Sequence, residues 1–153
     1  MDKTRNILFA LLAICAICLS SCKMEDDITE LFEGKTWYIT NGYVQGMPIS
    51  GDDIKTLCAS PTAYQITFSQ QSFIGTLSDG NTFTGKWEAN GKTRSFNLSI
   101  HQNANTSTML EQLIYNTLKK TTHYEGDTNI MKFYAEDANY IGFSSKRSPE
   151  SLL

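Results

Sequence analysis

The chain is poor in histidine, cysteine and proline, and it has no excess of basic charge. Its 153 residues contain two histidines, four cysteines and three prolines, and the formal net charge is -3. Two histidines without a paired His or Cys spacing give no zinc site, so no metal or other cofactor is expected. A mildly acidic chain also lacks the basic stripe of a nucleic-acid-binding protein. What it has is 41% hydrophobic and 11% aromatic residues, which predict a packed core.

The chain also lacks an apolar run long enough for a permanent membrane span. The uncharged apolar run from Ile7 to Leu19 is shorter than the about 20 residues that a transmembrane helix needs. Lys3 and Arg5 precede this run, and small residues follow it. A basic head, a short apolar run and small residues are typical of a secretory signal. We therefore expect residues 1–21 to be a signal peptide.

The end of this signal resembles a bacterial lipobox, in the sequence Leu19-Ser20-Ser21-Cys22. The resemblance implies that the Cys22 thiol carries a diacylglyceryl group and that cleavage occurs just before it. Cys22 is then the lipid attachment site, and outer-membrane lipid is its partner. The alternative is an ordinary signal peptide with an incidental cysteine. Cys15 and Cys18 leave with the signal, which leaves Cys58 alone and excludes an intrachain disulfide.

An acidic segment follows the proposed lipid site. Lys23-Met24-Glu25-Asp26-Asp27 resembles the surface-export signal of Bacteroidota-type lipoproteins. The resemblance implies a lipid-anchored protein on the outside of the outer membrane, and the periplasmic leaflet is the alternative location. We expect residues 22–33 to be an acidic, solvated tether.

From residue 34 onward the hydrophobic pattern is mostly that of antiparallel strands with one polar face. In the strand around Trp87, the alternation predicts that Trp87 and Phe83 point inward and that Lys86 and Glu88 point outward. A short helix over 52–58, capped by Asp52, would bury Cys58 on its apolar side. The expected strands are 35–43, about four strands within 64–100, and 121–125, 130–135 and 139–144.

One stretch changes to helical spacing. Thr108 and Glu111 fit a capping box, in which each side chain binds a free backbone N–H of the other residue. The sequence therefore predicts a helix over about 106–120, inserted before the last strands. The fold class is α+β, mostly antiparallel β, with one domain over 34–144 and a loose tail over 145–153.

The hairpin Gly80-Asn81-Thr82-Phe83-Thr84-Gly85-Lys86-Trp87 resembles the core of the META domain. Further matches are Gly34-Lys35-Thr36-Trp37, Ser107-Thr108-Met109 with Glu111, Tyr115, Leu118, His123-Tyr124 and the strand from Ile130 to Phe133. The resemblance implies the META architecture, an envelope location and a possible link to envelope stress. Gly80 occupies the position of the first cysteine of that family, and Glu111 falls near the position of a second, so no disulfide or redox role is carried over. A second resemblance, to lipocalin-like barrels, implies a carrier of a small apolar ligand.

No pattern of an active site is present, and we expect no enzymatic activity. His101 and His123 are the two histidines, and Cys58 is expected to be a small buried hydrophobe rather than a nucleophile. Turn residues with two oxygen donors, at 79–81 and 127–129, are too few for a calcium loop. Tyr38, Tyr43, Tyr134 and Tyr140 are candidate anchors of a recognition surface, or they complete the core. The sequence thus predicts a lipid-anchored envelope domain with an interaction or stress role, and a lipocalin-like ligand carrier is the alternative.

Overall fold

Nine strands form one antiparallel sheet in the part of the chain that the computed structural model describes, residues 25–78 and 80–147. The strands are β1 (Thr36–Val44), β2 (Met47–Pro48), β3 (Gln65–Phe68), β4 (Ser72–Thr76), β5 (Thr82–Asn90), β6 (Ser95–Gln102), β7 (Thr121–Gly126), β8 (Ile130–Ala135) and β9 (Tyr140–Ser144). The helices are α2 (Ile28–Phe32), α3 (Gly51–Ala59) and α4 (Met109–Lys119), with a 3-10 turn η1 (Glu136–Ala138). The expected signal peptide 1–21 and Cys22 lie outside the described residues.

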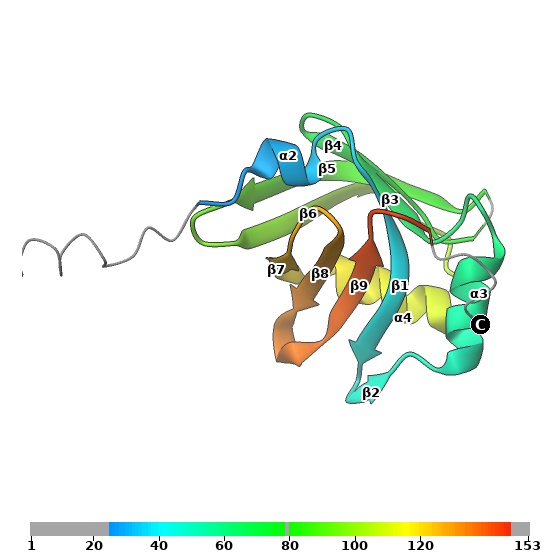
Figure 1. The fold of residues 1–153 in the computed structure, drawn as a ribbon. Helices are drawn as coiled ribbons and strands as arrows, with labels where there is room; N and C mark the ends of the chain where they lie inside the picture. The colour runs from blue at the N-terminus through cyan, green and yellow to red at the C-terminus, as the bar shows by residue number, and fades with distance from the viewer. Residues whose placement is uncertain (1–24, 79, 148–153) are drawn as a thin grey trace, which may run out of the picture.

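The sheet closes on itself into a barrel. Its strand order is β2-β1-β3-β4-β5-β6-β7-β8-β9, and β1 also pairs with β9. Eight strands therefore form the wall of the barrel, and β2 is a short extension of β1. Helix α4 lies between β6 and β7 in sequence and crosses behind β8, β9 and β1, whereas α3 packs at the side of β1 (Figure 1). This arrangement confirms the expected α+β class, mostly antiparallel, with one main helix before the last strands.

Aromatic side chains fill the barrel. Trp87 and Phe83 point inward and Lys86 and Glu88 are exposed, so the predicted register of β5 is confirmed. Phe96 and Phe133 stack with ring centroids 4.4 Å apart in the middle of the interior. The largest fully buried side chains are Trp37, Tyr124, Phe32, Phe68, Phe73, Phe83, Phe96, Phe133, Phe143, Leu57, Ile66 and Leu77.

The folded domain begins earlier than the sequence indicated. Residues 22–33 were expected to be a tether, but Asp26 is hydrogen-bonded into the barrel and α2 follows it. Tyr124 donates to Asp26 Oδ2 at 2.9 Å, and Arg94 Nε lies 2.9 Å from the same oxygen. Asp27 is the N-cap of α2, since its carboxylate accepts from the backbone of residues 29 and 30. The last two acidic residues of the export-like segment thus have structural roles as well.

The short helix α2 places Phe32 in the core. Phe32 has no exposed surface, and its ring lies 5.0–6.1 Å from those of Phe68, Trp87, Phe96, Tyr124 and Phe133. In a sequence, polar residues around a single aromatic residue are typical of a tether. The structure shows that this aromatic residue is part of the barrel interior.

The expected loose tail, 145–153, is also partly ordered. Arg147 donates to the carbonyl oxygen of Ala63 at 2.8 Å and to Oε1 of Gln65 at 3.2 Å. Its guanidinium group lies 4.6 Å from the centre of the Tyr38 ring. Residues 145–147 are therefore held against the loop before β3, because one arginine satisfies several acceptors there. Residues 148–153 lie outside the described part.

Helix caps and the first hairpin also differ in detail from the sequence-based expectation. Helix α3 begins after Ser50, which forms a capping box with Asp53, so Asp52 is not the cap. After β1, a tight turn in which Gln45 adopts a positive φ leads into the short strand β2, which the sequence-based expectation did not include. The capping box of Thr108 and Glu111 is confirmed, with α4 shorter than predicted.

Glu111 is a fully buried carboxylate that joins α4 to the hairpin before β5. It accepts hydrogen bonds from Ser107 and Thr108 at the start of the helix, and Asn81 Nδ2 donates to its Oε1 at 3.2 Å. Burial by itself would raise the pKa of this carboxyl group. The hydrogen bonds, including one from the Ser78 side chain, outweigh burial and lower the pKa to about 2.

We therefore expect the domain to lose stability in acid through Glu111. The ionised carboxylate stabilises the fold fully above about pH 4.5 and progressively less as the pH falls towards 2, because the unfolded chain binds the proton first. The lowered pKa corresponds to a loss of at most about 3 kcal/mol. Solvent screening at the start of the helix reduces this value. Urea unfolding at pH 6 and pH 2.5 measures it, and Glu111→Gln should flatten this pH dependence. An unchanged slope in that variant would contradict the assignment.

Candidate functional site

Five side chains form a continuous row across the outside of the barrel. Pro48 of β2 lies opposite Tyr43 of β1, Tyr43 opposite Tyr140 of β9, Tyr140 opposite Tyr134 of β8, and Tyr134 opposite His123 of β7. Directly opposed residues of antiparallel strands share a face, at a strand spacing of about 4.8 Å. We call this row of Pro48, Tyr43, Tyr140, Tyr134 and His123 the aromatic stripe.

The rings of the stripe are in contact with one another. The imidazole of His123 stacks on Tyr134 with centroids 4.8 Å apart and an interplanar angle of 4°. Tyr134 and Tyr140 are 5.4 Å apart, and Tyr140 and Tyr43 are 6.3 Å apart and nearly parallel. Each ring is thereby held by its neighbour, which lowers the entropy that it would lose on binding a partner.

Polar groups accompany the stripe. The Lys132 ammonium group lies 4.7 Å from the centre of the Tyr140 ring, a cation–π geometry. Burial and a hydrogen bond with Glu125 raise the pKa of the Tyr134 hydroxyl group, so it stays a neutral hydrogen-bond donor. Tyr43 is 37% exposed, and the other two tyrosines are half-buried. The stripe therefore offers ring edges, hydroxyl groups and one ammonium group to the solvent.

A β-bulge in β1 decides that Tyr43 belongs to the stripe. Tyr38 faces outward opposite Ser144, and strict alternation would then send Tyr43 inward. The register between β1 and β9 shifts by one residue between Ile39 and Asn41. The extra residue reverses the alternation, so Tyr43 also faces outward.

The structure brings together three of the four tyrosines that the sequence singled out. Tyr38 lies on the same outer face but is held under the guanidinium group of Arg147, away from the stripe. Sequence reasoning did not include His123 and Pro48 in this surface. The alternation of β7 and β8 about the turn at 127–129 could have placed His123 opposite Tyr134, whereas Pro48 depends on the short strand β2.

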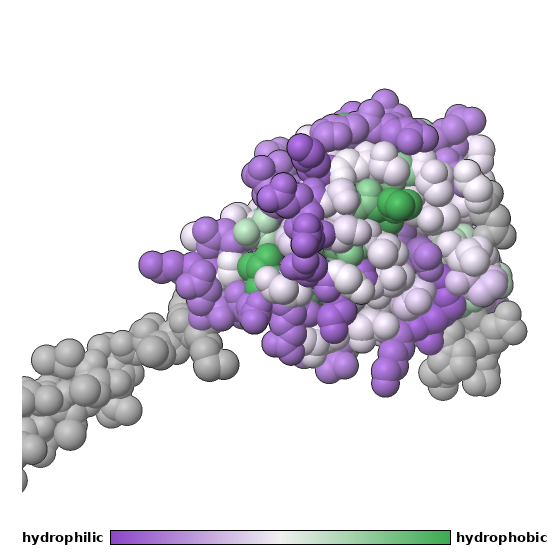
Figure 2. Space-filling view, turned by 90° about the horizontal axis from the view of Figure 1, so that it is seen from above, coloured by the Kyte–Doolittle hydropathy of each residue, from purple (hydrophilic) through white to green (hydrophobic). Residues whose placement is uncertain are grey.

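Other exposed apolar side chains are scattered. Met47, Ile74, Met109 and Ile130 are each more than half exposed, and they come from β2, β4, α4 and β8. In the view of Figure 2, apolar side chains form small separate spots within a largely polar surface. Single exposed apolar residues of this kind are ordinary for a folded protein.

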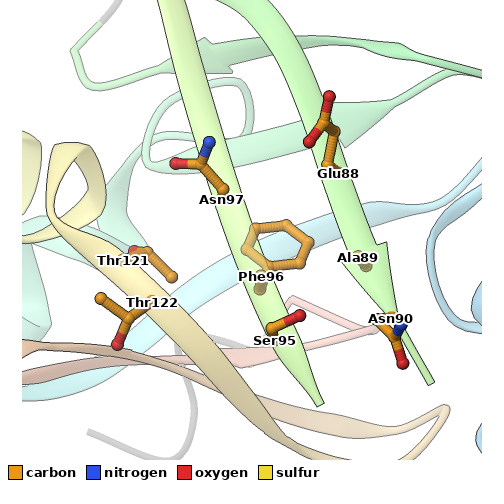
Figure 3. Close-up of a pocket in the computed structure, with 8 residues that line it drawn as sticks. All are labelled: Glu88, Ala89, Asn90, Ser95, Phe96, Asn97, Thr121 and Thr122. Atoms are coloured by element: carbon orange, nitrogen blue, oxygen red, sulfur yellow. The ribbon is translucent and has the colours of Figure 1, made fainter. Parts of the chain in front are cut away.

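A hollow of about 380 Å³, with a mixed polar and apolar surface, lies where β6 and β7 separate. The two strands share one residue pair, Ser95 with His123, and then diverge. Figure 3 shows the lining residues on β5, β6 and at the start of β7. They are Glu88, Ala89, Asn90, Ser95, Phe96, Asn97, Thr121 and Thr122. The hollow offers amides, hydroxyl groups and one carboxylate, which suit hydrogen bonding.

The remaining sequence candidates lie apart from one another. Cys58 is buried on the apolar side of α3, as predicted, and His101 is exposed on β6. The Thr122 hydroxyl group lies 3.2 Å from Nδ1 of His123; both residues are exposed, and Thr122 but not His123 lines the hollow. The Asp127 carboxylate accepts from the backbone of residues 129 and 130, and these bonds lower its pKa.

The described residues contain neither a metal-binding cluster nor a membrane-spanning helix. No group of three or more His, Cys, Asp or Glu side chains in this part of the chain is placed to hold a metal ion. Among the described helices, none has the length and apolar character of a membrane span.

Comparison with known proteins gives a family. Residues 23–145 match a domain described as a domain of unknown function, DUF4847. The chain belongs to the DUF4847 family. No curated protein matches it. The DUF4847 match begins in the segment expected to be a tether, which agrees with the early start of the folded domain.

Two solved structures are similar to this DUF4847 domain in fold. One is a DUF4847 family protein from Bacteroides vulgatus, with 22% sequence identity and a TM-score of 0.62, over 80% of this chain and 100% of that one. The other is a protein from Burkholderia xenovorans, with 15% identity and a TM-score of 0.54, over 82% of this chain and 94% of that one. At these identities the likeness concerns the fold. The comparisons name DUF4847 and not the META domain.

Proposed function

We propose that the protein is a lipid-anchored domain of the outer membrane that acts without catalysis, by binding a protein partner through the aromatic stripe. The observation that carries this proposal is the stripe itself: stacked, half-exposed rings with hydroxyl groups, and Lys132 over the Tyr140 ring. Tyrosine is favoured at protein interfaces because it adds a large contact area and a hydrogen bond at little entropic cost. The lipid anchor on Cys22 and the outward orientation come from the signal sequence and belong to this proposal.

The packed interior favours this role over that of a ligand carrier. A lipocalin-like carrier needs space inside its barrel for an apolar ligand. Phe32, Phe96 and Phe133 meet in the centre of this barrel at ring distances of 4.4–6.1 Å. A ligand could enter only if several of these rings moved away.

A role in envelope stress remains part of the proposal through the resemblance to the META domain. Two positions that carry this resemblance, Asn81 and Glu111, lie in contact, and Asn81 also exchanges hydrogen bonds with the backbone of Asn105. This contact supports a shared way of joining helix and hairpin. It bears on architecture, and the stress role is inferred from the resemblance alone.

Site-specific photocrosslinking in cells tests the stripe. We expect a crosslinking side chain in place of Tyr43 to give a discrete adduct, because this position lies in the proposed interface. The same side chain in place of Ile74 serves as the control. Ile74 is 55% exposed and Tyr43 is 37% exposed, so exposure alone would favour the control position.

A second substitution makes this test specific to the stripe. In the Tyr43 crosslinking variant, Tyr140→Ala should reduce the yield of the adduct, because it removes the neighbouring ring without changing the crosslinker. Lys86→Ala, at an exposed position of β5 that is separated from β1 by β3 and β4, should leave the yield unchanged. Equal adducts from positions 43 and 74, or a yield that ignores Tyr140→Ala, would overturn the stripe as the binding surface.

A further inference from the structure

The structure fixes the place where the proposed membrane anchor meets the barrel. Asp26 is held at the tip of the β5–β6 hairpin, and its backbone N–H donates to the Gly91 carbonyl group at 3.3 Å. A Cβ atom at Gly91 would collide with the Asp26 carbonyl oxygen, so only glycine permits this close approach. Arg94, on the other side of the tip, binds the Asp26 carboxylate through two nitrogens.

The chain between this contact and Cys22 is short. Four peptide steps separate Cys22 from Asp26, and a fully extended chain spans at most about 3.6 Å per residue. Asp26 therefore lies within about 14 Å of the acylated residue, whatever path the intervening residues take, and the hairpin tip is in direct contact with Asp26. The polar headgroup layer on each side of a bilayer is itself about 5–8 Å thick.

We propose that the β5–β6 hairpin tip, residues 90–94, rests on the lipid headgroup layer and that the barrel has a fixed membrane-facing end. Figure 1 shows this tip beside the point where the N-terminal segment enters the domain, with β2 and α3 at the opposite side of the molecule. The tip is polar and exposed at Lys92 and Thr93, so it suits hydrated headgroups rather than the hydrocarbon layer. This inference rests on the proposed lipid anchor at Cys22.

The orientation comes from covalent reach and not from attraction to anionic lipids. Arg94 is already paired with Asp26, and two further acidic residues, Asp27 and Glu30, follow Asp26 at the N-cap and in the first turn of α2. These acidic groups offset the two cations, so we expect the same orientation on a neutral membrane and at high salt.

Paramagnetic broadening on nanodiscs tests the proposal. The chain from Cys22 onward is coupled through this thiol to maleimide-bearing phosphatidylethanolamine, in phosphatidylcholine nanodiscs that contain a gadolinium-chelate lipid. Cys58 is buried, which directs the coupling to Cys22, and Cys58→Ala guards against a side reaction. We expect the amide signals of residues 90–94 to lose most of their intensity, and those of residues 47–55 to keep theirs.

A variant with a longer linker is the matched control. Ten Gly and Ser residues inserted between Met24 and Glu25 add a mean reach of roughly 17 Å and leave the barrel unchanged. The selective loss at residues 90–94 should then disappear. Uniform broadening of the original chain, or greatest broadening at residues 47–55, would overturn the proposed orientation. The lipid is coupled chemically in this experiment, so its result does not depend on whether cells acylate Cys22. A lack of acylation in cells would overturn the proposed lipid anchor and not the proposed orientation.

Discussion

Replacing Phe32 with alanine is expected to cost about 3–5 kcal/mol of unfolding free energy. The ring has no exposed surface and contacts five other aromatic rings, so its removal leaves a large cavity in the centre of the barrel. This loss is a large part of the 5–15 kcal/mol that is typical of a folded domain. Urea unfolding monitored by circular dichroism measures it.

The control for Phe32→Ala lies in the same short helix. Glu30 is exposed on α2, so Glu30→Ala should change the stability by no more than about 0.5 kcal/mol. The pair of variants separates burial of Phe32 from the helix as such. A Phe32→Ala domain as stable as the Glu30→Ala domain would return residues 28–33 to the status of a tether.

Replacing Cys22 with alanine is expected to abolish attachment of lipid and to leave an uncleaved precursor. In the proposed lipobox the Cys22 thiol is the acyl acceptor, and cleavage is expected just before this residue. Radioactive fatty-acid labelling of cells, with immunoprecipitation, gives the readout. Two acyl chains bury enough methylene groups for stable anchoring, at about 0.8 kcal/mol for each methylene group, so the original chain should be found in the membrane fraction.

Cys58→Ala serves as the control for Cys22→Ala, because Cys58 is buried within the folded domain. It should keep full labelling, apart from any general loss caused by reduced stability. Undiminished labelling of Cys22→Ala would contradict the lipoprotein assignment.

The barrel strands were predictable because their signal is local. Alternation placed Trp87 inward and Lys86 outward, and the capping box of Thr108 and Glu111 was confirmed, although the predicted helix began at about residue 106 and α4 begins at Met109. Such patterns depend on neighbours within a few residues in sequence. The fold class followed from the order of these elements.

The two ends of the domain were not predictable, because their order comes from distant contacts. Asp26 reads as one acid in an acidic segment, and its partners Arg94 and Tyr124 are far along the chain. Arg147 reads as part of a polar tail, and it binds backbone carbonyl groups before β3. Neither pairing affects the local hydrophobic periodicity of the sequence.

The candidate site could be predicted only in part from the sequence, for a similar reason. The tyrosines could be selected by residue type, but the stripe exists because three strand registers and a bulge align them. The bulge at residues 39–41 contradicts strict alternation, so a period-two reading puts Tyr43 on the wrong face. Register across a barrel is set by pairing partners and not by either strand alone.

The Asp26 contacts also decide how the domain responds to mechanical load. Asp26 binds Arg94, just before β6, and Tyr124, on β7. It thus bridges the shortest strand ladder of the described barrel wall, where Ser95 pairs with His123 and the Tyr124 N–H donates to the Arg94 carbonyl group. A pull on the N-terminal segment reaches this bridge before any long strand ladder. Tension between the membrane and a bound partner would therefore open the barrel between β6 and β7 first, while the longer ladders on either side stay closed.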